Sequence, residues 1–221
     1  GYLREFGNLV FHLSLVVVLM GIAWNNLWGY KGTSIVVEGR GFSNVITQYD
    51  EFHSGPMVDT DHLTPFSLKV KRFHTDFERG PVQRGAARMF RADVTTSYRG
   101  EKKDTEIEVN HPVTLGRDKV HILGHGYAAH VTVTDGKGNI AYSGPVVFQP
   151  QDGNFSSWGV IKAPDARPQR LAFEGWFLPF ATVDQRGPRS IFPQADNPQL
   201  FLNVWSGPPK KETGTPENVY V

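Results

Sequence analysis

Residues 6–30 read FGNLVFHLSLVVVLMGIAWNNLWGY and contain no Asp, Glu, Lys or Arg. At about 1.5 Å of rise per residue, a helix of this length spans roughly 37 Å, which is enough to cross a bilayer with some tilt. Trp24, Trp28 and Tyr30 lie at its far end, and such amphipathic rings favour the membrane–water boundary. The stretch therefore predicts a transmembrane helix near the start of the chain.

His12 is the one histidine inside this stretch. An imidazole in hydrocarbon is costly unless something uses it, so His12 is a candidate ligand or proton relay. A histidine that only hydrogen-bonds a neighbouring helix is the alternative.

Two other interpretations of residues 6–30 fit less well than a transmembrane helix. A buried helix of a soluble domain is usually shorter and less uniformly apolar. A signal peptide would need a small-x-small cleavage site after Met20, where Trp and Asn follow instead.

Composition excludes several kinds of chemistry. The 221 residues include 23 Lys and Arg against 22 Asp and Glu, so no basic excess supports nucleic-acid binding. The absence of cysteine excludes disulfides, thiolate metal sites and a cysteine nucleophile within this chain. The sequence starts at Gly1 rather than Met, which predicts that it is part of a longer protein.

The rest of the chain has the pattern of a β protein. We expect residues 1–32 to form the helix with its flanks, and residues 33–221 to form one mainly β, antiparallel, sandwich-like domain of about nine strands. A sandwich is favoured over a closed barrel. Strong turn signals stand at Arg99-Gly100 and at DGKGN, residues 135–139. Strands are expected at residues 33–38, 65–77, 89–98, 103–109, 119–123, 127–134, 140–142, 146–149, 169–178 and 198–206.

Motifs for catalysis are missing or misplaced. GKGNIA at residues 136–141 matches G-x-G-x-x-A, but it falls in a β-turn and opens no helix, so it predicts no dinucleotide site. The sequence holds no G-x-S-x-G, P-loop or H-E-x-x-H motif, and we assign no catalytic residue. Asp59, Asp61 and His62 could be drawn as metal ligands. Adjacent carboxylates in a Gly/Pro loop more often form a solvated turn, which is the favoured interpretation.

Four histidines fall close together outside the predicted helix, at His111, His121, His125 and His130. If His121 and His130 sit on paired strands they could meet, and a loop histidine such as His125 could bind a ligand or relay a proton. The favoured interpretation is structural. In it, His111 fixes a turn before Pro112 and the others are partly exposed strand residues.

Several stretches resemble the ResB family of cytochrome c biogenesis proteins, in an actinobacterial form. The resemblance covers essentially the whole chain, and its specificity lies in the order of the motifs together with a Phe-His pair in the predicted span. The matching stretches are REFGNLVFH at residues 4–12, EVNHPVTLG at 108–116, KVHILGHGYA at 119–128, VTVTDG at 131–136, GNFSSWG at 153–159 and APD at 163–165.

The resemblance implies a role in System II cytochrome c assembly. Such proteins work with a CcsA-type membrane partner to move haem to the outer face of the plasma membrane and support its attachment to apocytochrome c. His12 matches the histidine of the family's third span that is implicated in holding haem iron, so it is the expected cofactor-binding and metal-binding residue. Residues after about 32 are then extracytoplasmic, and membrane lipid surrounds the helix.

The resemblance implies that the chain is not an enzyme on its own and that it contributes to a holocytochrome c synthase complex. The cysteines for thioether formation must belong to the cytochrome, because this chain has none. The earlier spans and the fourth span of the family are absent from the sequence. A different class is the alternative: a tethered β-sandwich module that binds an envelope or protein partner and uses the helix as a passive anchor.

Overall fold

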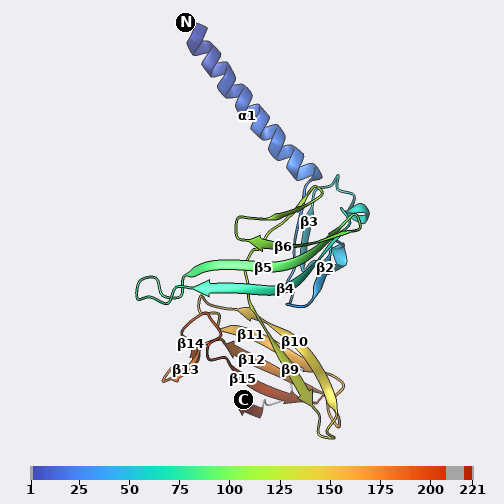
Figure 1. Cartoon of the computed structure of the whole chain (residues 1–221), viewed down its shortest axis with the longest axis vertical. Helices are drawn as coiled ribbons and strands as arrows, with labels where there is room; N and C mark the ends of the chain where they lie inside the picture. Colours follow the sequence, from blue (N-terminus) through green and yellow to red (C-terminus); the bar gives the residue numbers. More distant parts are fainter. Residues whose placement is uncertain (1, 208–216, 221) are drawn as a thin grey trace. The chain divides into compact units, whose positions relative to one another are not determined.

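The computed structural model describes residues 2–207 and 217–220 (Figure 1). It has one long helix, α1 (Tyr2–Trp28), followed by antiparallel strands and two short 3-10 helices. The prediction of a mainly β chain with one N-terminal helix is confirmed, whereas the sandwich-like packing of the sheets stays a prediction. The strands are β1 (Tyr30–Thr33), β2 (Gly41–Ser43), β3 (Glu51–Ser54), β4 (Phe66–Phe77), β5 (Ala87–Tyr98), β6 (Glu101–Glu108), β7 (Val113–Leu115), β8 (Asp118–Val120), β9 (Tyr127–Thr134), β10 (Ile140–Pro150), β11 (Ser157–Ala163), β12 (Leu171–Leu178), β13 (Ala181–Asp184), β14 (Gly187–Ser190), β15 (Gln199–Ser206) and β16 (Glu217–Tyr220).

The described chain forms two compact units, and the strands β4, β5 and β6 each contribute residues to both. Three segments make up each unit, because the chain passes between them several times. Unit 1 consists of Gly1–Lys71, Val94–Thr105 and Thr114–Lys119, and unit 2 consists of Arg72–Asp93, Glu106–Val113 and Val120–Val221.

Unit 1 joins the helix to a small β structure. After α1 ends at Trp28, β1 pairs antiparallel with β3, and the Gly55 amide donates to the Gly29 carbonyl over 2.9 Å. The Met57 amide reaches back to the carbonyl of Leu27 over 3.0 Å. These bonds satisfy carbonyls at the end of α1 that have no partner within the helix. The first loop after β3 is therefore fixed to the last turn of the helix.

Buried Asn44 organises the interior of unit 1. Its amide nitrogen donates to the Tyr30 hydroxyl and to the Thr64 carbonyl, each over 2.9 Å, and its amide oxygen accepts from the Tyr49 hydroxyl over 2.6 Å. One side chain thus ties the first strand after the helix to two later loops. A buried amide with its bonds made is stabilising, because leaving the partners unpaired would cost desolvation.

We expect Asn44→Ala to lower the free energy of unfolding by about 2 kcal/mol, since it leaves the Thr64 carbonyl without this donor and the desolvated hydroxyls of Tyr30 and Tyr49 without this partner. Denaturant unfolding of the full chain in an uncharged detergent measures this change. The exposed neighbour Thr47 supplies the matched variant, Thr47→Ala, which should leave the midpoint unchanged. Equal midpoints for the two variants would show that the Asn44 bonds contribute nothing.

Unit 2 is built on a six-stranded sheet with the strand order β16-β15-β12-β11-β10-β9. Its core side chains come from alternate positions of these strands, as expected where one face of a sheet is buried. Phe148 is fully buried at the centre, and Gly159 of the neighbouring strand lies directly against its ring. A side chain at position 159 would collide with that ring. The buried core cluster consists of Val133, Phe148, Ile161, Ala163, Ala166, Phe177 and Leu202.

The hairpin predicted at residues 135–139 is confirmed between β9 and β10. The Asp135 amide donates to the Asn139 carbonyl over 2.8 Å, and Gly138 takes a φ of 84° that favours glycine. The Asp135 carboxylate accepts from the amides of Lys137, Asn139 and Arg167, and these backbone bonds hold its pKa below the usual value. The G-x-G-x-x-A match lies in this turn and in β10, where no helix begins.

The strand predicted at residues 33–38 is wrong, because the chain pairs only over Tyr30–Thr33. Hydrogen bonds between side chains and backbone link this segment to a later loop instead of a longer sheet ladder. The Ile35 amide donates to the Asp50 carboxylate over 2.6 Å, and the Ser34 hydroxyl donates to the Gln48 carbonyl. Such local side-chain bonds compete with a sheet ladder, and β-branched composition alone does not reveal them.

Candidate functional site

The helix α1 carries the residue that sequence analysis singled out. Glu5–Trp28 is long and apolar enough to cross a membrane, and the side chains of residues 5–26 are exposed throughout. Exposed apolar side chains over this length indicate that lipid or another membrane protein surrounds the helix. The two rings at its end, Trp24 and Trp28, stack with 4.3 Å between their centroids.

The geometry of His12 leaves one ring nitrogen free. Its Nδ1 atom lies 2.8 Å from the backbone carbonyl oxygen of Asn8, one turn earlier in the helix. A carbonyl oxygen only accepts hydrogen bonds, so Nδ1 must carry the proton in a neutral ring. Nε2 then keeps its lone pair and has no hydrogen-bond partner among the described residues. The Phe11 ring meets the imidazole edge-on at 5.4 Å.

This arrangement is the one that metal-binding histidines use. A hydrogen bond from the second ring nitrogen fixes the tautomer and the ring orientation, and it makes the free nitrogen a better donor. A neutral imidazole is a standard axial ligand for haem iron. The donor chemistry of His12 therefore fits an iron-bound macrocycle, and the exposed apolar helix around it suits a largely apolar ligand.

The structure does not bring the clustered histidines of residues 111–130 together. His130 lies on β9 and pairs in register with Pro145, while His121 lies after the end of β8, so the two are not on paired strands. His111 closes a turn with Glu108 through two backbone hydrogen bonds, of 3.0 and 3.2 Å. His111, His121 and His130 are all exposed.

His125 differs from the expected exposed strand residue. It lies outside any strand, in the segment before β9, and its ring is surrounded by five aromatic side chains of unit 2. Neither ring nitrogen is accessible to solvent, and neither has a hydrogen-bond partner among the described residues. The ring centroids lie at 4.2 Å from Phe155, 4.7 Å from Phe90, 5.7 Å from Phe77, 5.8 Å from Phe73 and 5.8 Å from Tyr127.

Burial determines the charge state of this cluster. Desolvation lowers the pKa of His125 to about 4, because the apolar rings disfavour the imidazolium. Burial also raises the pKa of Tyr127 to about 12, and its hydroxyl donates to the Pro193 carbonyl over 2.6 Å. At neutral pH both rings are therefore uncharged. The sequence places His125 in a loop, but its aromatic partners come from β4, β5, β9 and the loop at Phe155, and such packing gives no local signal.

Asp59, Asp61 and His62 form a turn, as the favoured interpretation expected. Asp59 caps the 3-10 helix Thr60–His62 by accepting from the Asp61 amide, and its second carboxylate oxygen lies 2.8 Å from His62 Nδ1. The hydrogen bond from His62 lowers the pKa of Asp59. Over residues 2–207 and 217–220, no three His, Cys, Asp or Glu side chains gather in a way that could hold a metal ion.

The helix and the antiparallel sheets define a class of protein, a β protein joined to one helix able to cross a membrane. Within this class the chain belongs to the ResB-like family, whose family model matches residues 1–221. No solved structure matches the chain significantly.

The chain is also similar to curated proteins named cytochrome c biogenesis protein CcsB. The protein of Synechococcus sp. (strain CC9605) is 25% identical over 222 residues, which cover 99% of this chain and 44% of that protein. That of Synechococcus sp. (strain WH7803) is 28% identical over 193 residues, covering 87% and 39%. That of strain JA-3-3Ab is 28% identical over 115 residues, covering 52% and 22%. The chain thus spans less than half the length of these relatives.

Proposed function

We propose that this chain is part of a membrane protein for cytochrome c assembly, in which His12 supplies an axial ligand to haem iron. The observation that carries the proposal is the free Nε2 of His12 on an exposed, apolar helix. Membership of the ResB-like family and the names of the CcsB relatives support the same role. Haem is the cargo here, and its iron accepts the imidazole lone pair.

In the proposed role the chain acts with a CcsA-type partner in the plasma membrane. His12 lies about 9 Å along the helix from residue 6, which on the family's topology is toward the cytoplasmic leaflet. It would hold haem on entry, and the β units after residue 32 would lie outside the cytoplasm near apocytochrome c. The chain itself contributes ligand and platform, while the thiols for attachment belong to the cytochrome.

A passive anchor with a protein-binding β module is the second candidate function. The observation in its favour is that most of the chain forms the two β units. Among the described residues of these units, no group of side chains that could hold a metal ion is found. On this interpretation the identity of the helix is immaterial provided that it spans the membrane. The two candidates therefore predict different outcomes when the helix is exchanged.

We expect that exchanging residues 5–28 of the full-length protein for a leucine–alanine span of equal length lowers haem in the purified complex at least about tenfold. Cells carrying the exchange should lose holocytochrome c in parallel. The matched variant is the same span with Phe11 and His12 retained, which should recover part of the haem. Wild-type haem and cytochrome yields with the plain span would instead establish a passive anchor.

A further inference from the structure

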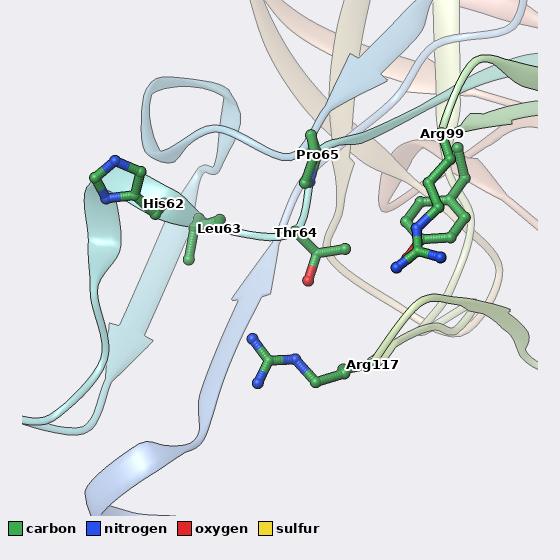
Figure 2. A pocket seen from close by; sticks show the side chains of 7 residues that line it. His62, Leu63, Thr64, Pro65, Arg99 and Arg117 are labelled. Carbon is green, nitrogen blue, oxygen red and sulfur yellow. The ribbon is translucent and has the colours of Figure 1, made fainter.

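Unit 1 contains a hollow of about 460 Å³ that lies away from His12 (Figure 2). Three separate segments line it: the loop 62–65 before β4, the turn between β5 and β6, and the turn between β7 and β8. This volume falls in the range of small-ligand sites. The lining residues are His62, Leu63, Thr64, Pro65, Tyr98, Arg99 and Arg117.

Two arginines dominate the charge of the hollow. Figure 2 shows the guanidinium groups of Arg99 and Arg117 reaching into the space from different sides, with the Thr64 hydroxyl directed into the same space. Within the described residues neither guanidinium is paired with a carboxylate. Arg99 lies over the Tyr98 ring, with 5.2 Å from Cζ to the ring centroid. Two unpaired, like-charged groups facing one space favour an anion there.

Acidic side chains adjacent in sequence to the lining residues do not line the hollow themselves. Asp59 is bonded to His62 and to the Asp61 amide in its own turn. Asp118 follows Arg117 in the chain but is not among the lining residues; it interacts with Tyr30, where burial and the carboxylate together raise the pKa of the Tyr30 hydroxyl. Among the residues that the structure describes, no carboxylate lines the hollow or forms an ion pair with Arg99 or Arg117.

The backbone behind the hollow is built for close approach. Gly116 has a φ of 67°, and a Cβ there would stand 2.8 Å from the Tyr98 hydroxyl and 3.0 Å from Thr64 Cγ2. Such a contact needs glycine, so the three lining segments meet at this point. Arg99 takes a φ of 51° in its turn. The arginines thus project from two tight turns that are packed against the same loop.

The loop that lines the hollow is fixed to the membrane end of unit 1. The Thr64 carbonyl accepts from Asn44, which also donates to Tyr30, two residues beyond the helix end. The same loop starts after β3, where the amides of Gly55 and Met57 donate to the carbonyls of Gly29 and Leu27. The hollow therefore belongs to the part of the chain that is hydrogen-bonded to the end of the span.

We propose that this hollow binds a phosphate-type oxyanion, held by Arg99, Arg117 and the Thr64 hydroxyl, and that its source is the headgroup of an anionic membrane lipid. Guanidinium groups match the oxygens of a phosphate with paired hydrogen bonds. The attachment of the loop to the end of α1, where Trp24 and Trp28 indicate the membrane boundary, brings the site to the level of lipid headgroups. This site does not depend on the proposed haem role of His12.

Calorimetric titration of the full chain in an uncharged detergent tests the site. Short-chain phosphatidylglycerol, short-chain phosphatidylcholine and inorganic phosphate are the three probes. We expect phosphatidylglycerol to bind most tightly and to protect residues 62–65 and 114–119 from hydrogen exchange. The double substitution Arg99→Gln with Arg117→Gln should weaken this binding about 30-fold, since each arginine contributes about fivefold toward an anionic surface.

The matched control removes two exposed cations of unit 1 outside the hollow, with Arg40→Gln and Lys69→Gln. It changes net charge equally and should bind phosphatidylglycerol like the wild type. Inorganic phosphate that binds as tightly as the lipid, and is lost in the same double variant, would support the oxyanion site but assign it to a soluble anion. The proposal is overturned if neither phosphatidylglycerol nor inorganic phosphate binds. It is also overturned if the control variant weakens phosphatidylglycerol binding as much as the double arginine variant does.

Discussion

If His12 is the proposed haem ligand, replacing it by alanine should lower the haem content of the full-length complex at least about tenfold, because alanine offers no nitrogen to the iron. The Soret absorbance of the purified complex measures the bound haem, and the yield of holocytochrome c in cells measures the function. The helix itself should be unaffected, since His12 is exposed and alanine favours helix.

The structure supplies matched controls for this substitution. Asn8→Ala alters the side chain one turn earlier but keeps the backbone carbonyl that accepts from His12 Nδ1, so haem should be retained. His121→Ala removes an exposed imidazole outside the span and should also retain haem. Added imidazole should restore part of the Soret band of the His12→Ala complex by occupying the vacated position. Wild-type haem content in that variant would exclude His12 from the mechanism.

Local patterns in the sequence predicted the elements whose structure depends on local chemistry. The uncharged stretch at residues 6–30 became α1, and the turn at Arg99-Gly100 separates β5 from β6 as expected. The DGKGN stretch became the β9–β10 hairpin because Asp135 and Gly138 supply the bonds and the positive φ that the turn needs. Strand β11 and the hairpin of β13 and β14 were not predicted; the hairpin is a short pairing of four residues on each side, which resembles a loop in the sequence.

Neither the hollow of unit 1 nor the aromatic cluster around His125 could be predicted, because long-range packing creates both. Arg99 and Arg117 stand in different turns, and only the fold directs them into one hollow. The aromatic surroundings of His125 combine β4, β5, β9 and the loop at Phe155. His12, in contrast, stands out in the sequence itself, because an ionisable side chain within an apolar span is conspicuous, and its role as a haem ligand stays a prediction.

Burial of the His125 imidazole predicts that the free energy of unfolding depends on pH. Its pKa is about 4 in the folded chain and near 6.5 in an unfolded chain, so between these values the unfolded state binds more protons. The free energy of unfolding is therefore highest above about pH 6.5, where the ring is neutral in both states, and it falls as the pH decreases toward 4. We expect a loss of about 1 to 2 kcal/mol between pH 7 and pH 5, which allows for partial exposure of the residue.

Substitution by phenylalanine should remove this dependence. His125→Phe replaces two buried, unpaired ring nitrogens with carbon inside an aromatic cluster, and we expect it to stabilise unit 2 by about 2 kcal/mol at pH 7 and by more at pH 5. Denaturant unfolding of the full chain in detergent at both pH values measures the effect. His130→Phe, on an exposed position of β9, is the matched control and should keep the wild-type pH dependence. Apart from the substituted residue, the titrating groups are the same in each variant as in the wild type, so comparison of the two variants isolates His125. A His125→Phe chain as acid-sensitive as the wild type would show that the imidazole has polar partners in the folded state.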